Sequence, residues 1–183
     1  MKYLIQGASV VLMTAGVALA QTPTPPMPAA PPAAQASRLS DADQQFVDKA
    51  AIGGLYEVQA GRIAEKSANQ QVKRFGTRMV HDHSAANAKL QQIVTAAGGT
   101  VPQALDQEHR QELDHLRSLH GAAFAQAYMQ NMVKDHDTDA QEFGKAAQSL
   151  DNPQLKGFPQ QTLPVIEAHD KMAHQITEKM ASR

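Results

Sequence analysis

The chain has 183 residues, with 17 basic and 18 acidic side chains and neither cysteine nor tryptophan. This length is enough for one domain with a real hydrophobic core. The lack of cysteine excludes disulfides, thiolate metal sites and cysteine catalysis. Because the charge is nearly balanced and no basic patch stands out, we expect no nucleic-acid partner.

Residues 1–20 have the pattern of a secretory signal peptide. Lys2 precedes a mostly apolar run from Leu4 to Leu19, and Ala18-Leu19-Ala20 fits the small-x-small cleavage rule. The run is too short and too interrupted for a membrane span, so an uncleaved anchor is the weaker alternative. We therefore predict export, with cleavage before Gln21, to the periplasm or an outer-membrane-associated location. No cysteine follows this cleavage point, so no lipid anchor is expected.

Residues 21–39 are rich in proline and alanine and nearly uncharged. Proline removes a backbone donor and fixes φ, so this composition predicts an extended, disordered linker. The folded domain is then predicted over residues 40–181.

The first half of this domain contains two predicted helices with apolar seams at spacings of three and four. Ser40 is the expected N-cap of the first helix, which is predicted to end near Ala68. The second helix follows a turn at Asn69 and Gln70. It is predicted to stop at Gly98-Gly99.

The second half begins with a polar segment and a short predicted helix from Asp106 to about Leu119. A third long helix is predicted from Ala122 to Leu150. Asn152 and Pro153 are typical of the N-cap and first position of a fourth helix. Two further prolines, Pro159 and Pro164, predict a kink or break in its first part.

The loop lengths predict the topology. Tight turns join the helices of each pair, whereas about twenty residues separate the pairs, enough to cross the length of a bundle. We therefore predict an all-α, ferritin-like four-helix bundle with a long crossover that contains a short extra helix. An up-down-up-down bundle, in which the short helix caps one end, is the alternative.

Each long helix has one ionisable side chain on its apolar seam: Glu57, His83, His136 and His169. At about 1.5 Å of rise per residue, counting from the turns places all four in one layer. Burial of such groups is costly unless they pair or bind a metal. We predict that they bind one divalent metal, such as Zn, Fe, Mn or Cu. The alternative is a buried hydrogen-bonded network that fixes helix register.

Two aspartates lie beside the inner histidines, in the echoing segments MVHDH at 79–83 and MVKDH at 132–136. Asp82 and Asp135 are turned about 100° from the seam and could support histidines on other helices. The remaining five histidines fall off the seam and are predicted to lie at the surface: His81, His109, His115, His120 and His174. Of these, His81 is the one that could join the site.

The chain resembles the exported bacterial family called domain of unknown function 4142. The resemblance rests on Asp82-His83, His136, and Leu163-Pro164 followed by His169. It spans residues 40–177. It implies export and a ferritin-like fold, and it implies no established role. The matching stretches are FVDKAAIGGLYEVQAGRIAEKSANQQVKRFGTRMVHDH, GGTVPQALDQEH, LHGAAFAQAYMQNMVKDH and LPVIEAHDKMAHQI.

No Glu-x-x-His motif occurs in the chain, so a ferritin-type di-iron centre and iron storage are disfavoured. Three functions then remain: an envelope metal-binding protein, a structural or stress-related envelope protein that binds a protein partner, and a metalloenzyme. The metalloenzyme is the weakest, because no nucleophile motif, phosphate loop or HExxH signature appears. We predict no catalytic residue, and the sequence leaves the oligomeric state open.

Overall fold

A computed structural model describes residues 38–182 of the chain. The predicted signal peptide and nearly all of the predicted linker lie outside the described residues. Within them every regular element is an α-helix, as predicted. The helices are α1 (Asp41–Ala64), α2 (Gln70–Ala96), α3 (Gln107–Ser118), α4 (Gly121–Ser149) and α5 (Pro153–Ala181).

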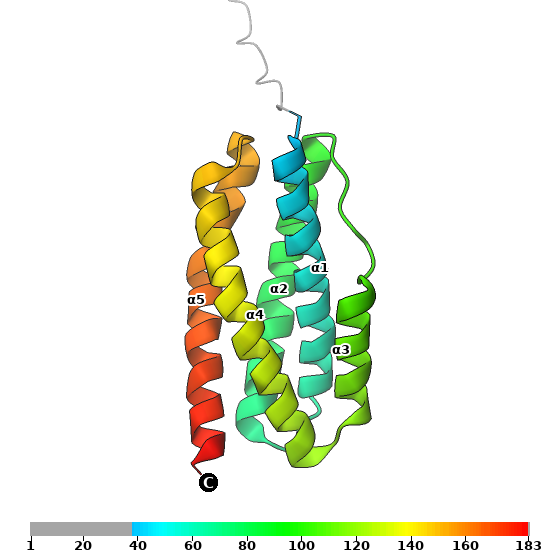
Figure 1. The fold of residues 1–183 in the computed structure, drawn as a ribbon, viewed down its shortest axis with the longest axis vertical. Helices are drawn as coiled ribbons and strands as arrows, with labels where there is room; N and C mark the ends of the chain where they lie inside the picture. The colour runs from blue at the N-terminus through cyan, green and yellow to red at the C-terminus, as the bar shows by residue number, and fades with distance from the viewer. Residues whose placement is uncertain (1–37, 183) are drawn as a thin grey trace, which may run out of the picture. The chain divides into compact units, whose positions relative to one another are not determined.

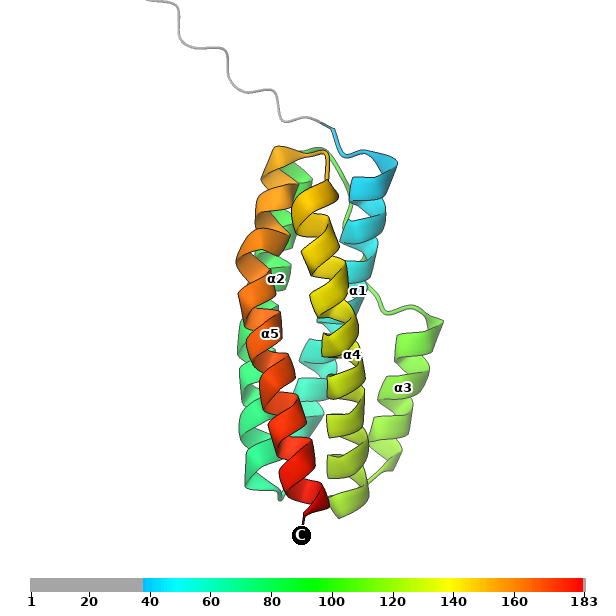
Figure 2. The same ribbon diagram turned by 60° about the vertical axis from the view of Figure 1, so that its left-hand side comes forward.

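Two helical hairpins form the bundle. Helix α1 packs along α2, and α4 packs along α5, while α2 also lies against α5 (Figure 1). Helices α2 and α4 run in the same direction, because the connection between them returns along the bundle (Figure 1). This connection contains α3, which lies on the outside of the bundle against α1 and α4 (Figure 2). The predicted crossover with its short helix is therefore present, whereas an up-down-up-down bundle would need α4 to run opposite to α2.

Side-chain caps define the helix starts where the sequence predicted them. The Ser40 hydroxyl accepts from the Asp43 backbone N–H, and the Asp43 carboxylate accepts from the Ser40 backbone N–H. Asn69, Asp106 and Asn152 accept from backbone N–H groups of α2, α3 and α5 in the same way. These caps fix the starts of α1, α2, α3 and α5, whereas α4 begins after His120 without a side-chain cap.

Asp43 also links the two hairpins. This carboxylate is fully buried, and its Oδ1 accepts from the Asp151 backbone N–H at 3.1 Å in the turn between α4 and α5. The start of α1 is thereby fixed beside that turn.

One predicted helix end is wrong, and a predicted break is absent. Helix α1 ends at Ala64, about a turn before the predicted end near Ala68. Helix α5 is continuous through Pro159 and Pro164, so of the predicted kink or break the break does not occur. The apolar face of α5 packs into the core on both sides of these prolines, and that packing outweighs the loss of two backbone donors. On this helix Ile166 is buried, whereas Val165 is 37% exposed.

The core has two apolar clusters with a polar layer between them. One cluster contains Tyr56, Met79, Met132 and Ala173, and the other contains Ala51, Leu90, Phe143 and Ile166. On α2, α4 and α5 the predicted histidine falls between these two sets in sequence, and on α1 Glu57 is adjacent to Tyr56 at the edge of the first cluster. No helix among the described residues is both long and apolar enough to cross a membrane.

Candidate metal centre

The four predicted residues meet in the polar layer, one from each long helix. Their exposed fractions are 2% for Glu57, 7% for His83 and 0% for both His136 and His169. The histidine rings lie with centroids 5.3 to 5.7 Å apart. The shared layer that the sequence predicted is therefore present in the structure.

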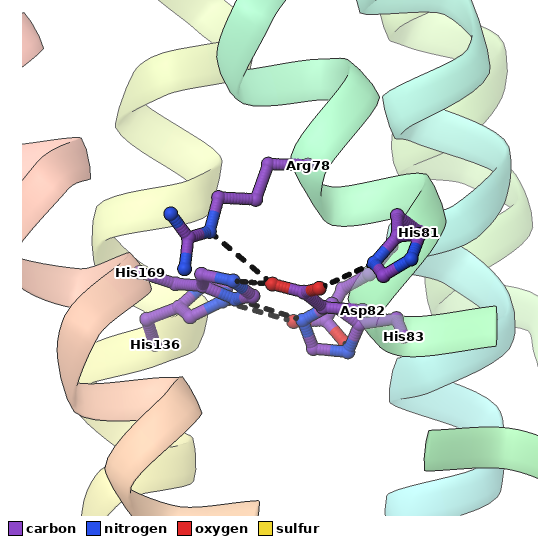
Figure 3. A network of polar contacts seen from close by, with 7 residues as sticks. Arg78, His81, Asp82, His83, His136 and His169 are labelled. Carbon is purple, nitrogen blue, oxygen red and sulfur yellow. Dashed lines mark hydrogen bonds and ion pairs between the residues drawn. The ribbon is translucent and has the colours of Figure 1, made fainter. Parts of the chain in front are cut away.

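Each histidine has one ring nitrogen engaged by an oxygen acceptor. His83 Nδ1 lies 2.6 Å from Glu57 Oε2, and His136 Nδ1 lies 2.9 Å from the Met132 carbonyl oxygen. His169 Nε2 lies 2.9 Å from Asp82 Oδ2 (Figure 3). When a ring N–H donates to each of these oxygens, the second nitrogen of each ring carries a lone pair.

The second nitrogens of His83 and His169 face each other. The three histidines each offer one ligand atom, and these atoms all lie within 4.8 Å of one another. His83 Nε2 lies 3.3 Å from His169 Nδ1. Two nitrogens bound at ~2.0–2.1 Å to a tetrahedral metal are separated by about 3.3 Å, so this spacing fits a shared ion.

Glu57 contributes a further unsatisfied atom. Its Oε1 lies 3.5 Å from His136 Nε2, and neither atom has a hydrogen-bond partner among the described residues. Buried polar atoms without partners are rare in native structures. Both atoms are therefore available to a bound cation.

Burial controls the protonation of the cluster. It lowers the pKa of His83, His136 and His169 to about 4, so the rings are neutral and able to bind metal at neutral pH. Burial also raises the pKa of Glu57 to about 7, although the nearby His136 opposes this shift. Glu57 can thus be present with or without its proton near pH 7.

Asp82 supports the cluster from outside, as predicted from its position beside His83. Besides His169, this carboxylate accepts from Arg78 Nε at 3.2 Å and His81 Nδ1 at 2.7 Å (Figure 3). Burial raises the pKa of Asp82, but the hydrogen bonds from His81 and His169 outweigh it and leave the pKa below its usual value. Asp82 is therefore an ionised acceptor for His169.

Asp135 has a different environment from the one predicted. Its Oδ2 has no hydrogen-bond partner among the described residues, and its side chain lines a cavity of about 420 Å³ between α1, α3 and α4. Burial, followed by the charge of Glu57, raises its pKa to about 7. Asp139 lies one turn further along α4 and lines the same cavity, and burial raises its pKa well above the usual value.

Asp139 was not predicted to lie beside Asp135, although their spacing of four residues puts them on one face of a helix. His109 was predicted to lie at the surface, whereas its ring lines the cavity and contacts Tyr56 edge-on. His81 is 82% exposed and reaches the cluster only through Asp82.

Comparison with known proteins gives a family and a fold. A family model described as "Domain of unknown function (DUF4142)" matches residues 28–176. Among solved structures, the chain is similar to the crystal structure of a DUF305 fragment from Deinococcus radiodurans, with a TM-score of 0.68 and 9% sequence identity. That match covers 78% of this chain and 99% of the other, and at this identity it shows the fold alone. No curated protein matches the chain.

Proposed function

We propose that this chain, which belongs to the DUF4142 family, binds one divalent transition-metal ion in the core of its helical bundle. The ligands are one nitrogen from each of His83, His136 and His169, with Glu57 Oε1 as the fourth. Imidazole and carboxylate ligands suit Zn, Fe, Mn or Cu.

The observation that carries this proposal is the arrangement of the outer ring nitrogens. A histidine that ligates a metal almost always donates its other ring N–H to a carboxylate, a backbone carbonyl or a water. His83, His136 and His169 contact Glu57, the Met132 carbonyl and Asp82 in this way. Three independent supports of this kind around one point favour a metal centre over three separately buried histidines.

The lone pairs supply a second argument. When Glu57 and Asp82 are ionised and accept from the rings, His83 Nε2 and His169 Nδ1 face each other as two acceptors 3.3 Å apart. Two buried acceptors without a donor destabilise the folded protein. A cation placed between them removes that penalty.

A structural role is the second candidate, and the raised pKa of Glu57 favours it. A protonated Glu57 would donate from Oε2 to His83 Nδ1, and the Nε2–H of His83 would donate to His169 Nδ1. That network holds α1, α2 and α5 in register without a metal. In this case the protein would act in the envelope through its surface and a protein partner.

Elemental analysis of the purified protein separates the two candidates. We expect about one metal ion per chain after dialysis against Zn²⁺, and loss of that ion in His136→Ala. His115→Ala is the matched control, since this histidine is exposed on α3, and it should retain the metal. No stoichiometric metal in the wild type, or retention in His136→Ala, would overturn the proposal.

We also propose that the protein is exported and processed before Gln21, on the basis of its first 20 residues. Mass spectrometry of the protein isolated from its own cells tests this. We expect a chain that begins at Gln21 in the periplasmic fraction. An intact chain that begins at Met1 in the cytoplasm would contradict it.

A further inference from the structure

The cavity between α1, α3 and α4 is strongly acidic. Its two lysines are already paired, Lys49 with Glu142 at 2.6 Å and Lys134 with Glu112 at 3.7 Å. Seven carboxylates line it: Asp48, Glu57, Asp106, Glu108, Asp135, Asp139 and Glu142. Low-dielectric walls of one sign concentrate counter-ions in such a cavity.

Glu57 connects this cavity to the histidines. It lines the cavity although it is 2% exposed, and its Oε1 has no hydrogen-bond partner among the described residues. Its other oxygen contacts His83 at 2.6 Å. A cation in the cavity therefore reaches Glu57, itself a proposed ligand, before the three histidines.

The other side of the cluster has the opposite charge. There Arg78 pairs with Asp82, the carboxylate that supports His169 (Figure 3). A cavity of about 400 Å³ between α2 and α5 is lined by Arg74, Arg78 and Lys179 and by no acidic residue. Positive charge on this side repels an approaching cation.

The carboxylates of the acidic cavity lie too far apart to coordinate a dehydrated ion directly. Among the described residues, three ligand atoms lie within 4.8 Å of one another only in the histidine cluster and in a group on α4 and α5 formed by Asp137, Asp170 and His174. Carboxylates that are spaced further apart can still hold a cation through its water shell.

We infer that the acidic cavity is the port through which a hydrated divalent cation reaches the histidine cluster. Asp135 and Asp139 receive the ion, and Glu57, the proposed fourth ligand, is the last carboxylate before the three histidines. This inference rests on the proposed metal binding. To that proposal it adds the route by which the metal enters and the form in which it enters, a hydrated divalent cation.

The charge of the port is tested by measuring the rate at which purified metal-free protein binds Co²⁺. Stopped-flow absorption spectroscopy of the bound Co²⁺ gives this rate. At low ionic strength, and at a pH above the raised pKa of both aspartates, we expect association in Asp135→Asn/Asp139→Asn to slow by about tenfold or more and to lose most of its salt dependence. Glu167→Gln/Glu178→Gln is the matched control. It removes the same charge from exposed positions on α5, which contributes nothing to the cavity, and its rate should equal that of the wild type.

The path itself is tested by a steric plug. Gly53 lines the cavity, and a Cβ added there meets no atom within 4 Å. In Gly53→Leu we expect association and dissociation of Co²⁺ to slow by the same factor, so that Kd is unchanged. Gly144→Leu is the control, because Gly144 has equally open space on α4 but lies outside the cavity.

The outcomes separate the port from the proposed function. Wild-type uptake of one Co²⁺ with unchanged rates in both the charge and the plug variants would overturn the port and leave metal binding standing. Failure of the wild type to bind stoichiometric Co²⁺ would overturn metal binding, and the port with it.

Discussion

The three histidines differ in where their orientation comes from. His136 donates to a carbonyl one turn back on its own helix, so α4 alone sets its tautomer. His83 and His169 depend on carboxylates of neighbouring helices, Glu57 on α1 and Asp82 on α2. Loss of either carboxylate should therefore disturb the metal site without removing a histidine.

Asp82→Ala tests this dependence. It leaves His169 without its acceptor, and we expect metal affinity to fall by about 10- to 100-fold, as for other outer partners of ligating histidines. Competition with a chromophoric chelator measures the change. His81→Ala removes another contact of the same carboxylate and should leave the affinity as it is. Equal losses in both variants would mean that Asp82 acts through general packing.

Asp139 should make stability depend on pH. Burial raises its pKa well above the usual value, so between pH ~4 and that raised pKa the folded state holds a proton that the unfolded state releases. Its contribution therefore destabilises the fold as pH rises through this window. Asp139→Asn removes the effect. In urea unfolding of metal-free protein, we expect the variant to match the wild type below about pH 4 and to gain stability over it towards pH 7. A difference that does not change with pH would contradict this.

At the scale of the helices, close approach of α1 and α2 depends on small residues. A Cβ added at Gly76 would come within 2.6 Å of the Ala64 Cβ and 2.9 Å of the Gly61 carbonyl oxygen. Backbone and Cβ atoms cannot move aside as flexible side chains can. The two helices must therefore separate to accept any side chain at this position.

Gly76→Ala should consequently destabilise the protein, although alanine favours a helix over glycine by about 1 kcal/mol. Gly144→Ala has the same intrinsic gain and open space around its Cβ, and it should stabilise the protein by up to about that amount. Thermal unfolding compares the two. A stabilised Gly76→Ala would show that α1 and α2 can move apart without cost.

The helices and the buried layer could be predicted because their signals are local or periodic. Caps such as Ser40 and Asn152 mark the starts, and one polar residue interrupts each apolar seam. The continuity of α5 through Pro159 could not be predicted, since it depends on packing against other helices. The acidic cavity was missed for the same reason, because α3 completes it from outside the four seams.

In the molecule as a whole, the polar layer joins all four long helices at one height. A bound metal would give the unpartnered atoms there a bonding partner. It would join α2, α4 and α5 through the three histidines, and α1 through Glu57. Because the ion binds the folded state, stability should rise with its concentration.

Zn²⁺ at about 100 times its Kd should therefore add about 2.7 kcal/mol to the free energy of unfolding. Removal of the ion with a chelator should reverse the gain. Chemical unfolding with and without Zn²⁺ measures it, and His136→Ala should show no such gain. A similar gain in His136→Ala would place the ion elsewhere.

The division of the core into two apolar clusters also affects how the protein opens. Contacts within each cluster are hydrophobic, whereas the layer between them holds neutral histidines and a carboxylate with unpartnered atoms. Without metal, we expect the two ends of the bundle to open as separate cooperative units. Amide hydrogen exchange should then differ between the residues on either side of the layer, and a bound ion should merge the two units into one.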